Sequence, residues 1–138
     1  MVCTAITSSR SSLGSAHAAA AAGRRVLVVD CDPQVGVTAQ LTDFTPDNPA
    51  AMSFADVLDR NNPAPIDQAV VPTRRSGIDL VPSCFDELQA AQDALFGRPG
   101  AENSLTRVLQ PVASQWDHIF IDTRPATDLI TRNAAIGW

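Results

Sequence analysis

The sequence predicts an α/β fold in which helices flank a parallel sheet. Short, continuous apolar runs, typical of strands buried on both faces, alternate along the chain with helix-forming segments. This alternation predicts parallel strands joined by right-handed crossovers. Two of the apolar runs end in acids, at Asp30 and Asp122. Because ligands of such sheets bind at the carboxyl ends of the strands, these acids are candidate site residues.

The first half of the chain is predicted to contain two strands and two helices. Residues 2–6 (VCTAI) form a short buried strand, and residues 15–23 (SAHAAAAAG) form a helix that ends at Gly23. Residues 25–30 (RVLVVD) are a second continuous apolar strand. Residues 53–60 begin with a serine three positions before an aspartate, a variant of the capping box that predicts the start of a helix.

The second half continues the alternation. Residues 77–83 (GIDLVPS) are a third strand, and residues 83–97 repeat the capping arrangement before a helix that stops at a glycine. Residues 104–116 carry apolar side chains at i, i+3, i+4 and i+7, a helical core stripe. Pro111 lies inside this stripe and should kink the helix or limit it to its first turns. The last predicted elements are a strand at residues 117–122 (DHIFID) and a helix at residues 126–138.

The composition predicts a single globular domain that spans residues 1–138. The chain has 138 residues, of which 45% are hydrophobic and 18% charged, so it is neither disordered nor fibrous. A core of this size supports one domain but not two. The net charge of −5 and a pI near 4.7 argue against a surface that binds nucleic acid on its own.

The cysteines and histidines do not form a recognisable metal or disulfide pattern. Cys3, Cys31 and Cys84 fit no zinc spacing, and their odd number fits no disulfide framework. His17 and His118 are each isolated in the sequence. No apolar stretch is long enough for a transmembrane helix. Together with the absence of a disulfide framework, this predicts a cytoplasmic protein with reduced thiols.

Four segments carry a resemblance to a known family. The segments GRRVLVVDCDPQ, TAQL, IDLVPS and WDHIFIDTRPATDLITRNAA follow one another between Gly23 and Ala135. In order and spacing they resemble the ParA family of partition ATPases, which are relatives of MinD. The resemblance implies a P-loop NTPase-like fold, of which this chain would hold the N-terminal half. It also implies Mg-ATP as the cofactor.

The resemblance implies roles for four residues. Asp32 would orient or activate the attacking water, and Asp122 would be the Walker B acid that holds Mg²⁺ through water. Asp30 and Thr38 would lie in the first switch region near the metal, with Thr38 on the metal side and Asp30 on the nucleotide side. A ParA-like protein would bind ATP, dimerise around it, bind DNA nonspecifically and be stimulated by a ParB-like centromere-binding protein.

The phosphate loop departs from the family pattern K-G-G-x-G-K-T-T, since the same place reads SSRSSLGSAHA. Counting from the first strand places Arg10 on the signature lysine and Gly14 on the last glycine. The same count places Ser15 on the phosphate-binding lysine and Ala16 on the Mg-binding threonine. Arg10, Gly14 and Ser15 are therefore candidate nucleotide-binding residues. With this count the following helix is about two turns short of the family's length.

A second count is equally compatible with the sequence. Counting back from Gly23 with a helix of the family's length places Ser8 and Ser9 near the Lys-Thr pair, and the loop is then too short. The two counts exclude each other, and the sequence does not decide between them. With either count the loop has lost most of the glycines that close backbone approach to phosphate requires.

The chain contains no lysine, because all ten basic residues are arginine. An arginine neutralises charge, but its planar fork is a poor substitute for a compact ammonium group inside a tight loop. Val35 stands where the family has a glycine, and Arg124 replaces the first proline of D-x-P-P, either facing the nucleotide or lying in solvent. ATP binding and hydrolysis are therefore expected to be impaired.

The sequence leaves three functions open. The first is a ParA-type ATPase whose degenerate phosphate loop still binds nucleotide. The second is a non-catalytic interaction module that pairs with a ParB-like protein or a ParA homologue. The third is a truncated remnant without activity of its own. By resemblance, the second half of the sheet and the DNA-binding surface are missing, which argues against DNA binding by this chain alone.

Overall fold

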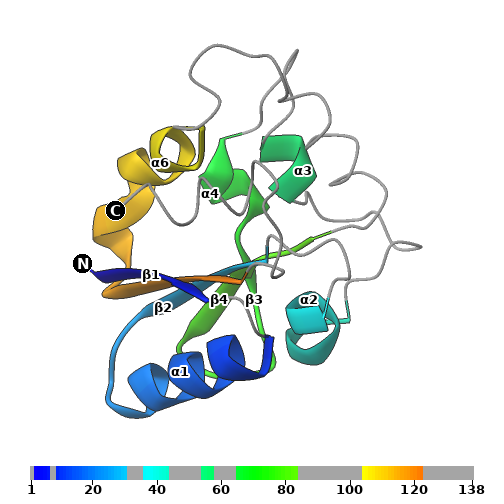
Figure 1. Ribbon diagram of the computed structural model, residues 1–138, viewed down its shortest axis with the longest axis vertical. Helices are drawn as coiled ribbons and strands as arrows, with labels where there is room; N and C mark the ends of the chain where they lie inside the picture. Colours follow the sequence, from blue (N-terminus) through cyan, green and yellow to red (C-terminus); the bar gives the residue numbers. More distant parts are fainter. Residues whose placement is uncertain are drawn as a thin grey trace.

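A five-stranded sheet forms the centre of the computed structural model (Figure 1). Its strands are β1 (Val2–Ile6), β2 (Val26–Asp30), β3 (Val71–Pro72), β4 (Ile78–Val81) and β5 (His118–Asp122). Their order across the sheet is β1-β5-β2-β4-β3. The first four in this order run parallel, as predicted, whereas β3 pairs with β4 in the antiparallel sense. The structure describes residues 2–6, 9–30, 36–43, 54–57, 65–83 and 104–122.

Helices cover both faces of the sheet. In Figure 1 one group lies below the sheet, and its members are α1 (Ser9–Ala21) and α2 (Gly36–Leu41). The other group lies above it, and its members are α3 (Phe54–Val57), α4 (Ile66–Ala69), α6 (Ser104–Leu109) and the 3-10 helix η2 (Gln110–Gln115). None of the helices in these ranges is long and apolar enough to cross a membrane. The α/β prediction is thus confirmed as a layered fold.

The continuous apolar strands serve two cores. Successive side chains of a strand point to opposite faces, so alternate residues enter different cores. Leu27 and Val29 pack with Trp116 on the face of α6 and η2. Val26 and Val28 pack with the core on the face of α1 and α2. All five residues of β2 are fully buried, which explains why its sequence shows no polar alternation.

The C-terminus of α1 is a glycine-dependent turn, as the sequence predicted. Gly23 has a φ of +81°, a backbone conformation that residues with a Cβ rarely adopt. Its N–H donates to the Ala20 carbonyl at 3.0 Å, and the Arg24 N–H donates to the Ala19 carbonyl at 3.1 Å. This pattern satisfies carbonyls in the last turn that have no partner within the helix. The turn returns the chain directly into β2.

Several features differ from the predicted elements, and the helices α2 and α4 were not predicted. α1 begins at Ser9, six residues before the predicted start. The helix predicted at residues 104–116 changes to 3-10 geometry at Gln110, next to Pro111, whose ring and missing N–H disfavour a continued α-helix. β3 was not predicted, because two residues that include a proline give no strand pattern. The helices predicted at residues 83–97 and 126–138, and the end of the one at 53–60, lie outside the described residues.

The amino ends of β2 and β5 are joined by contacts between Arg25 and Asp117. The Arg25 backbone N–H donates to Asp117 Oδ2 at 2.8 Å, and Arg25 Nε lies 3.6 Å from the same oxygen. In return, the N–H groups of Asp117 and His118 donate to the Arg25 carbonyl at 2.9 and 3.1 Å. These contacts fix the register in which Val26 pairs with His118.

Candidate functional site

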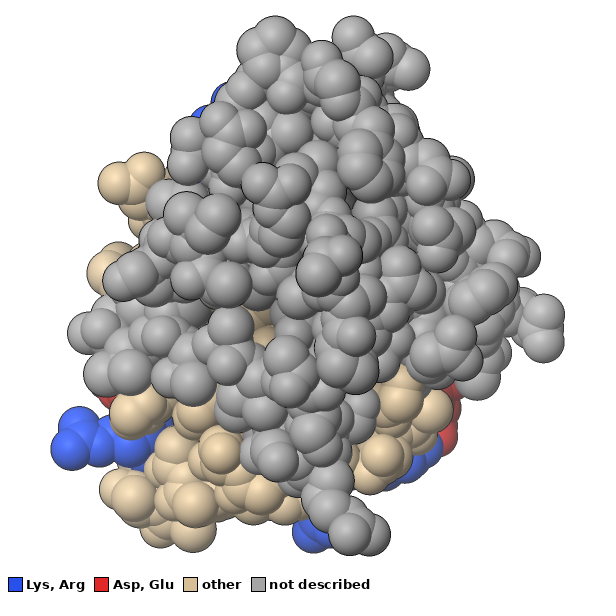
Figure 2. All heavy atoms as spheres, in the orientation of Figure 1, with Lys and Arg blue, Asp and Glu red and all other residues tan. Residues whose placement is uncertain are grey.

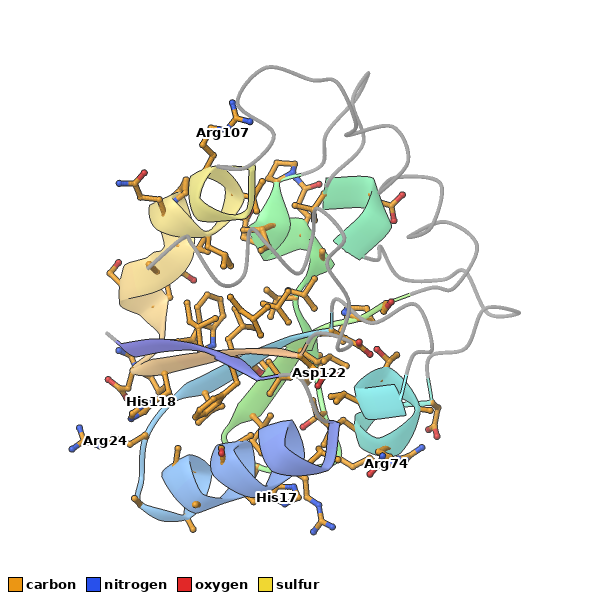
Figure 3. All side chains as sticks on the ribbon, in the orientation of Figure 1. His17, Arg24, Arg74, Arg107, His118 and Asp122 are labelled. Atoms are coloured by element: carbon orange, nitrogen blue, oxygen red, sulfur yellow. The ribbon has the colours of Figure 1, made fainter. Side chains whose placement is uncertain are left out.

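The two acids that end apolar strands lie next to each other in the sheet. β5 separates β1 from β2, and in this register Asp30 is the partner of Asp122, which also pairs with Ile6 of β1. Both acids are fully buried. Each lies two residues after a member of the lower core, Val28 or Phe120, so both side chains belong to the face of α1 and α2. Figure 3 shows Asp122 at the end of the sheet where α1 begins.

Thr38 connects Asp30, at the end of β2, to Ser83, which follows β4. Its backbone N–H donates to Asp30 Oδ2 at 2.9 Å, and its hydroxyl donates to the same oxygen at 2.6 Å. The Thr38 Oγ1 in turn accepts a hydrogen bond from the Ser83 backbone N–H at 2.9 Å. All three residues are fully buried. Because Thr38 lies in the first turn of α2, its N–H has no partner within the helix, and the Asp30 carboxylate supplies one.

The donor atoms at this edge suit Mg²⁺ only when phosphates complete the coordination. Carboxylate and hydroxyl oxygens are the hard ligands that Mg²⁺ prefers. Within the described ranges, no group of three or more His, Cys, Asp or Glu side chains could hold a metal ion. Mg²⁺ in nucleotide sites is held by one or two carboxylates, water and substrate phosphates. Asp122 fits that pattern as the candidate for a water-mediated contact.

The three candidates of the first count lie within α1. Arg10 is in its first turn, and Gly14 and Ser15 lie further along the helix. Gly14 is exposed, and a Cβ added there would meet nothing within 4 Å, so its backbone makes no close approach that requires glycine. Only two residues separate the end of β1 at Ile6 from Ser9. This arrangement agrees with the second count, in which the loop is short, rather than the first.

Several predicted site residues lie outside the part of the chain that the structure describes. Asp32, the predicted water-activating acid, is one of them, as are Val35 and Arg124. Of the residues assigned by resemblance, the structure therefore brings together Asp30, Thr38 and Asp122, and it places Arg10 at the start of the helix that follows β1.

The sequence interpretation missed the part that Ser83 plays at the site. It treated Ser83 only as a helix cap, whereas the Ser83 backbone N–H contacts Thr38, which is 45 residues away in the sequence. One signal was present, because Ser83 follows a strand just as Asp30 and Asp122 end theirs. A polar residue at the carboxyl end of a central parallel strand is a candidate for the same edge of the sheet.

Sequence comparisons place the chain among proteins of one family. The family model AAA_31, an AAA domain, matches residues 6–137. The Mycobacterium tuberculosis protein Rv1708 is 38% identical over 111 residues, which are 80% of this chain and 34% of Rv1708. The chromosome partitioning protein ParA of Myxococcus xanthus is 34% identical over 115 residues, which are 83% of this chain and 39% of that protein.

A solved structure agrees with the sequence matches. The crystal structure of cobyrinic acid a,c-diamide synthase from Mycobacterium smegmatis, with a bound ATP analogue and magnesium, superposes with a TM-score of 0.85 at 30% identity. The match covers 99% of this chain and 57% of the synthase. The chain thus spans only part of the length of each of these proteins. It belongs to the AAA_31 family of AAA domains and has the fold of the ParA-like P-loop NTPases.

Proposed function

We propose that this chain is the nucleotide-binding region of a ParA-type partition protein and that Mg-ATP binds at the carboxyl edge of its sheet. The observation that carries the proposal is the pairing of two buried acids, Asp30 and Asp122, on adjacent parallel strands where α1 begins. Strand-end acids beside the first helix are how P-loop proteins assemble a Mg-nucleotide site. The bound ATP analogue and magnesium of the similar synthase support this assignment.

Two acids would carry out the chemistry. Asp122 would accept hydrogen bonds from water in the metal's coordination shell, as a Walker B acid. Asp32 would accept a hydrogen bond from the attacking water and orient it toward the terminal phosphate. Mg²⁺, when bound, neutralises charge on the phosphate oxygens. Both acids act as acceptors, so the site still requires a cation from the protein to balance the phosphates.

Arg10 is the basic residue best placed to supply that cation. It lies in the first turn of α1, and α1 begins two residues after the edge strand β1. The N-terminus of a helix also favours anions, because its first N–H groups lack partners and the helix dipole is positive there. An arginine at this position of the sequence would add a full charge to this partial one. Gly14 and Ser15 would then support the helix rather than line the phosphates.

We expect little or no hydrolysis by this chain. The lysine that neutralises the developing charge on the transferred phosphate is absent from the sequence, and an arginine fits a tight loop poorly. A phosphate-release assay with Mg-ATP should give a rate indistinguishable from buffer. Release that is measurable in the wild type and lost in Asp32→Ala would contradict this expectation.

Nucleotide binding is tested by thermal unfolding with and without Mg-ATP. At about a hundred times Kd, the ligand should add roughly 2.7 kcal/mol and raise Tm by several degrees. Arg10→Ala should reduce this shift. Arg24→Ala is the matched control, because Figure 3 shows Arg24 at the opposite end of α1 from Asp122. A cooperative transition that Mg-ATP leaves unchanged would refute nucleotide binding and favour the second candidate.

The second candidate is a non-catalytic interaction module. The short connection between Ile6 and Ser9 favours it, because an eight-residue phosphate loop does not fit between them. Such a module would pair in the cytoplasm with a ParB-like protein or a ParA homologue, or form a dimer. It should capture that partner in a pull-down without nucleotide. A nucleotide requirement for capture would instead favour the ATP-binding function.

Neither candidate includes DNA binding by this chain alone. The net charge is −5, which disfavours the phosphate backbone. On the face drawn in Figure 2, the blue arginine side chains of the described residues lie at separate places on the outline, mostly low on the molecule but also at its upper left. This distribution does not make a basic patch in the described part of that face.

A further inference from the structure

The hydrogen bonds of Thr38 give it a structural role between two parts of the sheet edge. A hydroxyl group has one proton to donate and two lone pairs that accept. The Thr38 proton is donated to Asp30 at 2.6 Å, and one lone pair accepts the Ser83 N–H at 2.9 Å. Both contacts lie in a fully buried position, so they hold the hydroxyl between Asp30 and the Ser83 backbone, with one lone pair uncommitted.

We propose that Asp30, Thr38 and the Ser83 backbone form a clasp that positions α2 at the nucleotide edge, and that Asp30 and Thr38 do not themselves contact the metal. The proposal rests on the proposed function and refines it. The two buried acids then have separate roles. Asp122 serves the nucleotide, and Asp30 is a positioning residue whose carboxylate is bound to α2.

The geometry of the carboxylate supports this division. Asp30 and Asp122 are register partners on adjacent strands, and two ionised carboxylates so placed repel each other. A single oxygen, Asp30 Oδ2, accepts both the N–H and the hydroxyl of Thr38. Hydrogen bonds to an ionised carboxylate are stronger than neutral ones, and burial strengthens them further. The clasp therefore turns Asp30 Oδ2 toward α2.

The clasp holds the first turn of α2, whereas its last turn is held by the Arg74 backbone N–H, which donates to the Leu41 carbonyl at 3.0 Å. Val37 and Leu41 of α2 are buried in the lower core with Leu80 of β4. Apolar contacts hold a helix on a sheet but tolerate sliding, because they are not directional. The hydrogen bonds from Thr38 to Asp30 at the end of β2 and from Ser83 to Thr38 after β4 fix the position of α2 along the edge.

Three variants separate the clasp from general stability. Thr38→Val keeps the shape of the side chain but removes the hydroxyl, and Thr38→Ser restores it. Thr42→Val is the matched control, since it removes a hydroxyl that donates to the Thr38 carbonyl in the same helix. Amide hydrogen exchange of the full chain, measured by NMR, follows Ser83 together with Val28 and Ile121 in the centre of the sheet.

The clasp predicts a local effect. In Thr38→Val the Ser83 amide should exchange at least about tenfold faster, because its buried acceptor is lost. Val28 and Ile121 should keep their rates, and Thr38→Ser and Thr42→Val should resemble the wild type at Ser83. An unchanged Ser83 rate in Thr38→Val would overturn the clasp. Equal acceleration at all three amides would overturn it as well, since that is general destabilisation.

The division of roles is tested by measuring the Kd for ATP twice, once in excess Mg²⁺ and once in EDTA, which removes the metal. Thr38→Val should weaken ATP binding by a similar factor in both conditions, so the ratio of the two Kd values stays that of the wild type. Asp122→Asn should bring the ratio close to one. A ratio near one in Thr38→Val would make Thr38 a metal ligand and overturn the proposal. If the wild type binds no ATP, the proposed function fails, and the exchange rates alone decide on the clasp.

Discussion

Gly14 and Gly23 show that the same residue type has opposite effects at two positions of one helix. Gly14 is exposed inside α1, where glycine costs stability because it loses more backbone freedom on folding than other residues do. Gly23 follows the helix at a φ of +81°, where a Cβ is strained. The sequence predicted the role of Gly23 from its place after an alanine run. It assigned Gly14 to a phosphate loop in one of two counts, because counting from the first strand places it on the family's last glycine.

Alanine at each glycine should therefore change stability in opposite directions. Gly14→Ala should raise the free energy of unfolding by about 0.5–1 kcal/mol, since its Cβ would meet no neighbour. Gly23→Ala should lower it by about 1–2 kcal/mol. Urea unfolding of the two variants and the wild type gives both values. Loss of stability in Gly14→Ala would indicate that this position is not helical and would favour the first count.

At the scale of elements, β2 and β5 meet through polar residues at both ends. Arg25 and Asp117 are in contact at the amino ends, and Asp30 is the partner of Asp122 at the carboxyl ends. At the amino end, the Arg25 backbone N–H, and to a smaller degree its guanidinium charge, hold the pKa of Asp117 below its ordinary value of 3.8. A carboxyl group with a lowered pKa stabilises the folded state when it is ionised. Its contribution is complete above the unfolded pKa, near pH 4, and disappears as the pH falls through the lower folded pKa.

Asp117→Asn should therefore reduce stability at neutral pH, and its difference from the wild type should shrink as the pH falls below about 4. The effect should be small, because both side chains are partly exposed and water screens their attraction. Urea unfolding between pH 2 and 7 measures this difference. Asp67→Asn, an exposed acid on α4, is the control. A constant difference across the whole range would show that the Asp117 charge does not contribute.

Element boundaries were predictable where local chemistry sets them. Gly23 marked the end of α1, and Pro111 marked the change to 3-10 geometry. The start of α1 was not predictable, because Ser9, Arg10 and their neighbours lack apolar periodicity and an acidic first turn. β3 exists through its pairing with β4, and its sequence carries no strand signal.

At the scale of the whole molecule, the sequence predicted the layers but not the order of the strands. Apolar runs that end in Asp30 and Asp122 indicated a shared edge, because the carboxyl ends of parallel strands meet there. β5 lies between β1 and β2 because of packing across the sheet, and the periodicity of the sequence carries no information about that packing. The contact between Thr38 and Ser83 was also not predictable, because its donor is a backbone N–H, which nearly every residue has.

The position of β1 determines when this sheet can be completed. Among the described strands, β1 pairs only with β5, and Val2 meets His118, 116 residues later in the sequence. Closing a loop of that length is entropically costly, so this pairing should form late in folding. At a synthesis rate of about 5–20 residues per second, the first strand waits roughly 6–20 seconds for its partner. During translation β1 therefore stays without its β5 partner for this time.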